Sequence, residues 1–392
     1  MWKKDAEVKK FSNNLGSSEK GEFSEKIELS NKIKSTVEKI SGPDIKTMDL
    51  AQARLDSLTK PMGSLGRLEE LAKQIAGITG VLKPDFSKKL IIVMVADHGV
   101  VDEGVSAYPR EVTPQMVYNF LAGGAGINVL SRHVGADVVV VDVGVAAEFA
   151  AEFTGVPGQK NAGSLLINKK VAFGTSNIAK GAAMTKKQAF CAIESGITVA
   201  EEMISKGYGI IGTGDMGIGN TTASSAIAAS ICGVDVELVT GHGTGINDEG
   251  FKNKVNIIKR ALDINKPAPE NGIDVLSKVG GFEIGGIAGI ILGCASRKIP
   301  VVIDGFISGA GALIAEAIAP RCRDYMIASH CSVEKGHKII LERLKLKPLF
   351  NFDMRLGEGT GAAIGIGIAE AAVKILNEMA TFDEAGVSKK DE

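Results

Sequence analysis

The hydrophobic pattern of the chain changes near residue 85. Before it, apolar residues recur at helical spacing, which predicts three helices, with Ser64 as the N-cap of the third, at roughly 23–41, 47–58 and 64–79. After it, short continuous apolar runs alternate with helical segments. Such runs are typical of strands that are buried on both faces of a parallel sheet. We predict six strands, at 90–96, 138–145, 208–212, 236–241, 299–305 and 325–329.

Strands that alternate with helices indicate an α/β fold with a doubly wound, mostly parallel sheet. The helices before the first strand predict a separate helical layer. Near its end the chain reads RLGEGTGAAIGIGIAEAAVKILNEMA, a glycine turn that leads into a long helix. We divide the chain into a disordered start, N-terminal helices, a large α/β domain with the substrate site, a C-terminal helix and a polar tail, at 1–22, 23–85, 86–355, 356–380 and 381–392.

Composition limits the possible partners and the compartment. The 392 residues carry a formal net charge of -1, so neither nucleic acid nor an anionic membrane is an expected partner. The longest apolar stretch, 285–293, is too short to span a bilayer. The five cysteines are scattered without a CxxC motif, which favours a reducing cytoplasm over a disulfide framework or a zinc site.

Polar or glycine-rich segments follow nearly every predicted strand. Because ligands of such sheets bind beyond the carboxyl ends of the strands, we expect the side chains in these segments to converge on one crevice. They are Asp97, His98, Asp215, His242, Asp304, His330 and Ser332. No two of the histidines have helical i,i+4 spacing and no HExxH motif occurs, so we expect no metal. Ser332 lacks a Gly-x-Ser-x-Gly elbow and is not an expected nucleophile.

The segment GTGDMGIGNTT, at 212–222, combines two nucleotide-binding motifs. From Gly212 it reads Gly-x-Gly-x-x-Gly, the dinucleotide fingerprint, but the next predicted strand does not end on the acidic residue that NAD needs. From Gly214 it reads as a P-loop in which Asn220 replaces the lysine. The shared glycines and helix N-terminus suffice for one phosphate, as in a nucleoside monophosphate. A tight turn without a ligand is the alternative interpretation.

Two charged residues are candidates for chemistry on such a phosphate ester. Lys254, on the predicted helix after GHGTGINDEG, can supply a cation for the phosphate, although a lysine on a helix is more often simply solvated. Glu358 stands between two glycines at the start of the last helix. A carboxylate in a poorly hydrated pocket has a raised pKa, which suits a general base. A cap that interacts with the helix dipole is an equally good interpretation of Glu358.

Further short motifs accompany these segments along the chain. Together the set is GSLGRLEELA (63–72), ADHGV (96–100), YPREVTPQM (108–116), GGAGINVL (123–130), GTGDMGIGNTT, GHGTG, DGFISGAGAL (304–313), SHCSVEKGH (329–337) and GEGTGAA (357–363). In this order it resembles the nicotinate-nucleotide:dimethylbenzimidazole phosphoribosyltransferase family, over about residues 45–380.

The resemblance implies a defined reaction. Nicotinate mononucleotide gives its phosphoribosyl group to 5,6-dimethylbenzimidazole, which yields α-ribazole 5'-phosphate and nicotinate in the lower-ligand branch of cobalamin biosynthesis. The leaving group is a cationic pyridinium and needs no acid, whereas the acceptor must lose its ring proton to one base. Glu358 resembles the family's catalytic glutamate. No cofactor is implied, and the partners are two small molecules and a second copy of the chain. The family fold is a homodimer with a Rossmann-like large domain and a small helical domain built from both chain ends.

Substrate contacts follow from the same resemblance. Asp215 stands where many members have a glutamate, and Tyr108 stands where the family has a serine. The glutamine of the base pocket falls at Gln115 or is offset by one residue. The remaining matches, to the phosphate and ribose loop, the phosphate side, a strand-end aspartate and a backbone contact to the base, are Gly217, Gly219, Asn220, Thr221, Gly243, Lys254, Ser332, Asp304 and Leu356. Two other functions stay open: an NAD(P)-dependent oxidoreductase and a non-catalytic nucleotide-binding protein.

Overall fold

The computed structural model describes residues 29–149, 164–243 and 245–388, so the predicted disordered start lies outside the described residues. The strands are β1 Lys89–Ala96, β2 Ala136–Gly144, β3 Leu165–Asn168, β4 Ile210–Met216, β5 Val301–Ile303 and β6 Met326–Ala328. They form one parallel sheet in the order β3-β2-β1-β4-β5-β6. The order reverses between β1 and β4, as in a doubly wound fold, so the predicted fold class is confirmed.

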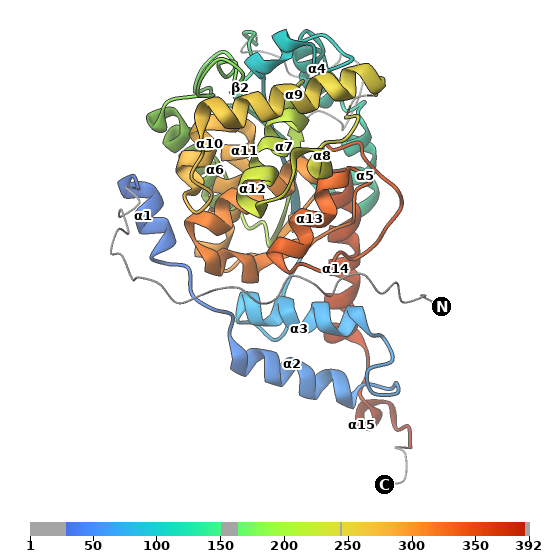
Figure 1. The fold of residues 1–392 in the computed structure, drawn as a ribbon. Coiled ribbons are helices and arrows are strands. Elements are labelled where there is room, and N and C mark those ends of the chain that lie inside the picture. The colour runs from blue at the N-terminus through green and yellow to red at the C-terminus, as the bar shows by residue number, and fades with distance from the viewer. Residues whose placement is uncertain (1–28, 150–163, 244, 389–392) are drawn as a thin grey trace, which may run out of the picture.

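Helices surround this sheet (Figure 1). In the first half of the chain they are α1 Asn31–Val37, α2 Ile45–Ser57, α3 Arg67–Thr79, α4 Val112–Ala122, α5 Gly126–Val134 and α6 Lys186–Ser205. In the second half they are α7 Asn220–Cys232, α8 Val236–Val239, α9 Asp248–Asn265, α10 Gly272–Val279, α11 Phe282–Ser296, α12 Phe306–Ile318, α13 Lys335–Leu344, α14 Thr360–Glu378 and α15 Phe382–Ala385. Two short 3-10 helices are η1 Gly99–Glu103 and η2 Pro320–Tyr325.

The two faces of the sheet pack against different helices, because successive residues of a strand point to opposite faces. Leu90, Ile92 and Met94 of β1 lie in a hydrophobic cluster with α6 and α11. Ile91 and Val93 lie in a second cluster with α3 and α14. All eight residues of β1 are therefore buried, which explains why this strand reads as a continuous apolar run.

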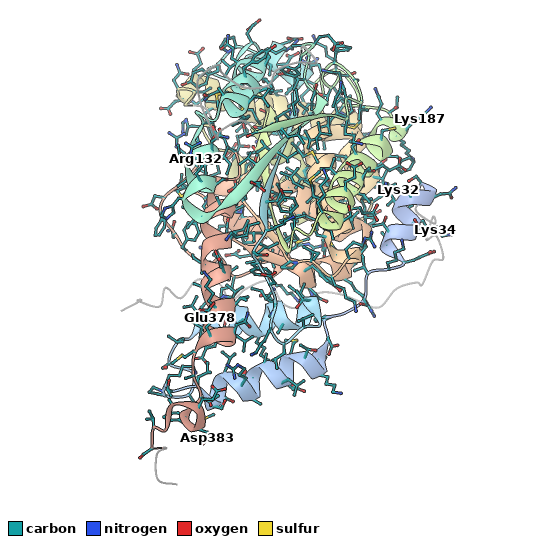
Figure 2. The ribbon with its side chains drawn as sticks, turned by 180° about the vertical axis from the view of Figure 1, so that it is seen from behind. Lys32, Lys34, Arg132, Lys187, Glu378 and Asp383 are labelled. Carbon is teal, nitrogen blue, oxygen red and sulfur yellow. The ribbon has the colours of Figure 1, made fainter. Side chains whose placement is uncertain are left out.

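Helices α2 and α3 and the C-terminal end of α14 project from the rest of the protein (Figure 1). The Arg54 guanidinium of α2 donates hydrogen bonds to the carbonyl oxygens of Leu376, at 2.6 Å, and Met379, at 3.3 Å. Figure 2 shows Glu378 and Asp383 at this projecting end. Segments from the beginning and the end of the described chain therefore meet there, and the division into a large and a small domain stays a prediction.

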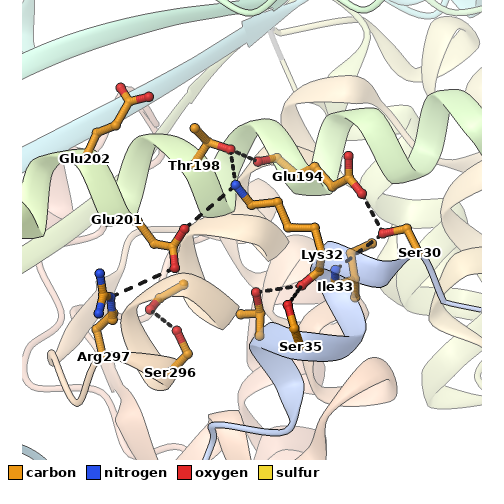
Figure 3. A network of polar contacts seen from close by, with 12 residues as sticks. Ser30, Lys32, Ile33, Ser35, Glu194, Thr198, Glu201, Glu202, Ser296 and Arg297 are labelled. Atoms are coloured by element: carbon orange, nitrogen blue, oxygen red, sulfur yellow. Dashed lines mark hydrogen bonds and ion pairs between the residues drawn. The ribbon is translucent and has the colours of Figure 1, made fainter.

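Helix α1 packs against α6 and α11 rather than beside α2 (Figure 3). The Ser30 hydroxyl donates to the Glu194 carboxylate at 2.5 Å, and the Lys32 ammonium donates to the Thr198 hydroxyl at 2.6 Å. Glu201 lies 3.7 Å from Lys32. The predicted helix at 23–41 is confirmed only as Asn31–Val37, and its first residues lie outside the described part of the chain.

One predicted strand is wrong. The segment 236–241 forms the short helix α8 instead, and the sheet does not include it. The Asp235 side chain caps this helix by accepting from the Glu237 amide at 2.8 Å, and the Thr240 hydroxyl donates to the Val236 carbonyl at 2.7 Å. A short apolar run cannot distinguish a buried helix from a strand, and here the aspartate cap and the threonine decide for the helix.

Three other boundaries differ from the sequence predictions. The edge strand β3 was not predicted, because it is short and its residues are half-buried or exposed. Helix α3 begins after Gly66, with φ of 50°, and not after Ser64, whose amide donates to Pro61 in a turn. The Glu69 carboxylate accepts from the Leu65 amide and shapes that turn. In the predicted polar tail, residues Phe382–Ala385 form the helix α15.

Helix α14 is long and apolar enough to cross a membrane by length and composition alone. However, 56% of its apolar window is buried inside the protein. Its residues Ala362, Ile366 and Ala369 belong to the hydrophobic cluster on one face of the sheet. The apolar character of α14 is therefore explained by its place in the core of this α/β fold.

Candidate active site

A cavity of about 560 Å³ lies beyond the carboxyl ends of β4, β5 and β6. Most residues of the sequence-predicted site line it: Tyr108, Asp215, Gly217, Asn220, Thr221, Gly243, Ser332, Leu356 and Glu358. The other four do not line it: Gln115, Gly219, Lys254 and Asp304. Most of the predicted site residues therefore line one cavity, and the other four lie outside its wall.

The segment at 212–222 is part strand and part turn. Strand β4 continues through Gly212 and Gly214, so the predicted glycine turn is wrong for these two residues. Gly214 allows a close backbone approach, because a Cβ there would collide with the Glu358 carbonyl oxygen. Only Gly217 and Gly219 belong to the turn itself. The dinucleotide fingerprint places its first glycine in a turn, so the geometry does not support that motif.

The turn leads into α7 and leaves the start of this helix uncapped. Gly219 has φ of 95°, and α7 begins at Asn220 without a side-chain cap and without an acidic residue in its first turn. The Ile218 amide donates to the Thr113 hydroxyl at 3.1 Å, which holds the turn against α4. The partial positive charge of a helix N-terminus attracts anions, so this end of the cavity suits a phosphate.

Lys254 lies directly behind the start of α7. Its side chain comes from α9, is 1% exposed, and donates from Nζ to the Thr221 hydroxyl at 2.8 Å. Burial lowers the pKa of Lys254 to about 8, and the nearby Glu334 charge opposes this effect. The ammonium therefore stays mostly charged near neutral pH. A charged lysine that is buried beside a helix N-terminus differs from the solvated lysine that its sequence context alone allowed.

Glu358 is held in an unusual backbone conformation. Gly357, Glu358 and Gly359 all have positive φ, at 79°, 62° and 93°. The glutamate is 6% exposed, lines the cavity, and accepts from the Ile127 amide at Oε2 over 3.1 Å. Burial raises the pKa of Glu358, and the Ile127 hydrogen bond only partly opposes this. Such a carboxylate has the raised basicity that proton abstraction near neutral pH requires.

Asp304 supports the turn that carries Glu358. Its fully buried carboxylate accepts from the backbone amides of Gly359, at 3.1 Å, and Ala362, at 3.0 Å. It therefore caps α14, and Glu358 is not the cap. Burial raises the pKa of Asp304 to about 7, although these amides lower it. The expected contact of Asp304 with substrate stays a prediction.

Asp215 is the second carboxyl group in the cavity wall. Its Oδ2 accepts from Nδ2 of the Asn220 side chain at 3.1 Å, whereas Oδ1 is buried and has no hydrogen-bond partner among the described residues. Burial raises the pKa of Asp215 well above its usual value, and the charges of Asp304, Glu283 and Glu358 add to this. The raised pKa favours the protonated form of Asp215, which can donate a hydrogen bond.

One end of the cavity is largely apolar. Tyr108 and Leu356 line it and are 54% and 60% exposed. Met116 lines it too, whereas Gln115 is exposed and points elsewhere on α4. The offset of one residue that the sequence allowed therefore puts a methionine in the wall. Val112, Met216 and Ile218 complete this apolar wall.

Two charged residues of the wall were missed by the sequence reasoning. Arg355 donates to the Gly243 carbonyl at 3.3 Å, and Glu334 lies against Gly241, where a Cβ would meet its carboxylate. Both line the cavity and a neighbouring one of about 210 Å³. The available signal was that Arg355 is next to Leu356 and that Glu334 is two residues after Ser332. Because charged residues in loops are mostly solvated, the sequence alone did not favour either residue.

The strand-end histidines do not gather at the cavity as predicted. His330 lines it, and burial lowers its pKa to about 4. His242 lies on an exposed loop beside the smaller cavity, and His98 is buried against Glu283. Asp97 accepts from the Ala146 amide, away from the wall. Within the described residues, no group of three or more His, Cys, Asp or Glu side chains could hold a metal ion.

Comparison with known proteins identifies the family of the chain. Residues 40–387 match the family model described as phosphoribosyltransferase. The chain belongs to this family. A relative from Geobacter sulfurreducens, named nicotinate-nucleotide–dimethylbenzimidazole phosphoribosyltransferase, is 56% identical over 353 residues, which cover 90% of this chain and 97% of the relative. A relative of the same name from Chloroflexus aggregans is 55% identical over 357 residues, covering 91% and 98%.

The family also has a solved structure with the same fold. The crystal structure of CobT from Thermus thermophilus has a TM-score of 0.82 and 44% sequence identity to this chain. The match covers 88% of this chain and the whole of that one. The resemblance stated from the motifs is therefore confirmed for the family and for the fold.

Proposed function

We propose that this phosphoribosyltransferase transfers the phosphoribosyl group of nicotinate mononucleotide to 5,6-dimethylbenzimidazole. The products are α-ribazole 5'-phosphate and nicotinate, in the lower-ligand branch of cobalamin biosynthesis. The observation that carries the proposal is one cavity that joins a buried carboxylate of raised pKa, Glu358, to an uncapped helix N-terminus. The names of relatives at 56% and 55% identity support the choice of substrates.

The phosphate of the donor binds at the start of α7. The backbone of Gly217 and Gly219 and the Thr221 hydroxyl form the cradle, and Lys254 supplies the cation behind it. Ser332 is the hydroxyl on the opposite wall. Charge-assisted hydrogen bonds of this kind are stronger than neutral ones, so the lysine should dominate donor affinity.

The base binds at the apolar end, between Tyr108, Met116 and Leu356. Its unprotonated ring nitrogen attacks C1' from the face opposite nicotinate, so the β-glycoside becomes an α-glycoside. The electron pair of the broken C1'–N bond returns to the pyridinium nitrogen. The Glu358 carboxylate takes the proton that the other ring nitrogen of the base loses. Asp215 lines the same cavity, and its raised pKa favours the protonated form, which can donate a hydrogen bond to a substrate.

A direct assay tests the reaction. Purified protein is mixed with nicotinate mononucleotide and dimethylbenzimidazole, and nicotinate and α-ribazole 5'-phosphate are measured by chromatography. We expect equal amounts of both products. Glu111→Gln is the matched control for Glu358→Gln. It changes an exposed carboxylate at the N-cap of α4 and should keep wild-type turnover. Nicotinate that appears without the ribazole product would indicate hydrolysis, and no nicotinate at all would refute the proposal.

We further propose a cytoplasmic homodimer with the two-domain organisation of the family. The five described cysteines are all free thiols, which supports a reducing compartment. Light scattering coupled to gel filtration should give a mass of about twice the 40.9 kDa of one chain. A mass equal to one chain at micromolar concentration would contradict the dimer.

A further inference from the structure

A buried ion pair lies behind the glycine turn and has no place in the chemistry proposed above. His98 follows β1 and is 1% exposed, and Glu283 lies in the first turn of α11 and is fully buried. Their Nε2 and Oε1 atoms are 2.8 Å apart. Neither side chain lines the cavity.

The imidazole of His98 fits between glycines of the turn. A Cβ at Gly219 would lie 3.2 Å from His98 Cβ, and one at Gly217 would lie 3.7 Å from His98 Cδ2. On the far side, a Cβ at Gly281, just before α11, would collide with His98 Cε1. The absence of side chains at Gly217, Gly219 and Gly281 leaves the space that His98 fills.

Glu283 fixes the ring from one side. Its carboxylate pairs with the imidazole, and its second oxygen, Oε2, has no hydrogen-bond partner among the described residues. The same carboxylate contributes to the raised pKa of Asp215 in the cavity wall. The charge of Glu283 is thus coupled to the turn through His98 and to the site through Asp215.

Stability is a weak explanation for such a pair. Burying two charges costs desolvation free energy, and well-packed apolar residues of similar size often serve a fold equally well. A second buried pair in this chain, Lys60 with Glu69 at 2.9 Å, shows that the fold tolerates such pairs elsewhere. The pair at His98 differs because this histidine lies next to Gly217 and Gly219, which form the proposed phosphate cradle.

We propose that His98 and Glu283 are positioning residues that hold the turn Gly217–Gly219 in the shape that binds the donor phosphate. The inference rests on the proposed function for the identity of the donor. It predicts a larger effect on the nucleotide than on the base, because of the residues of this turn only Ile218 belongs to the apolar wall. It also predicts that the two residues act as one unit, since removing one partner leaves the other charge buried and alone.

The test compares single and double variants in binding and turnover. His98→Gln leaves Glu283 unpaired and should weaken nicotinate mononucleotide binding, measured by calorimetry, by about 5-fold or more, with a similar rise in its KM. The kcat and the KM for dimethylbenzimidazole should change less than about 2-fold, within ordinary variation for untouched sites. The double variant His98→Gln with Glu283→Gln removes both charges and should recover most of the lost affinity.

Two controls separate positioning from a loss of folding. Lys60→Met breaks the other buried pair and should lower Tm without changing nucleotide affinity. Glu283→Gln keeps the volume and an acceptor for the ring, so it answers the question if His98→Gln does not fold. The proposal is overturned if folded His98→Gln, or Glu283→Gln in its place, binds the nucleotide like the wild type, or if binding of the base weakens equally. Calorimetry needs no turnover, so a wild type that binds the nucleotide but releases no nicotinate would refute only the proposed function.

Discussion

Two glycine-rich turns of this chain look alike in sequence and differ in what they present to the cavity. The turn at Gly217–Gly219 opens α7 without a side-chain cap and without a carboxylate at the helix start, which suits the proposed phosphate site. The turn at Gly357–Gly359 opens α14, whose first amides are already occupied by the carboxylate of Asp304. An occupied helix start cannot bind phosphate, and it presents Glu358 instead. We propose that the buried carboxylate of Asp304 is the difference that keeps an anion away from the second turn.

The largest expected effect comes from a substitution in the second turn, Gly357–Gly359. Glu358→Gln should lower kcat by about 10²–10⁴-fold, the contribution of a positioned base, and leave donor KM nearly unchanged. Glutamine keeps the volume and the acceptor for the Ile127 amide. Steady-state kinetics with both substrates measures the split. A folded variant with wild-type kcat would show that Glu358 has no role in proton transfer.

The next largest effect is expected at the first turn, from Lys254 behind the start of α7. Lys254→Ala should raise the KM for nicotinate mononucleotide by roughly 10- to 150-fold, because a charge-assisted hydrogen bond of about 1.5–3 kcal/mol is lost. The kcat at saturation should fall far less than in Glu358→Gln. Lys259→Ala on the same helix, where the ammonium is paired with Glu237 near the surface, is the matched control. Equal donor KM in both variants would remove the lysine from the phosphate site.

A smaller effect is expected from Gly214, the residue of β4 that packs against Glu358 of the second turn. A Cβ at Gly214 in β4 would collide with the Glu358 carbonyl oxygen, so Gly214→Ala should displace the base. A displacement of about 1 Å can cost about 10²-fold in rate, and we expect a loss of kcat up to that size with little change in donor KM. Gly181→Ala, where the added methyl group meets open space, is the control. A rise in donor KM instead would mean that Gly214 serves the first turn.

The smallest effect concerns the base pocket. Tyr108→Ser should change the relative rates with benzimidazole, its dimethyl form and adenine, because Tyr108 lines the apolar end of the cavity. Gln115→Ala, which alters an exposed neighbour, should leave these ratios unchanged. The ratios are measured by competition between acceptors in one vessel. Identical ratios in the wild type and Tyr108→Ser would place the tyrosine outside the pocket.

The sequence predicted the strands that are buried on both faces, because a continuous apolar run between turn residues is typical of such strands. The prediction failed where one side chain determines whether the backbone forms a helix or a strand, as Asp235 does for α8. The division of GTGDMGIGNTT into strand and turn depends on what packs against each glycine, and a single sequence does not contain this. The capping role of Asp304 was hidden for the same reason, since its partners Gly359 and Ala362 lie far along the chain.

The acid limb of the pH–kcat profile tests the assignment of the base most directly. Burial raises the pKa of Glu358 above its ordinary value of 4.5, and a base acts only when it is deprotonated. In the wild type, kcat should therefore fall as the pH decreases through a pKa above 4.5. In Glu358→Gln, the residual kcat should show no such limb. The same limb in both proteins would contradict the assignment and direct attention to another carboxyl group, with Asp304, whose pKa is about 7, as the first candidate.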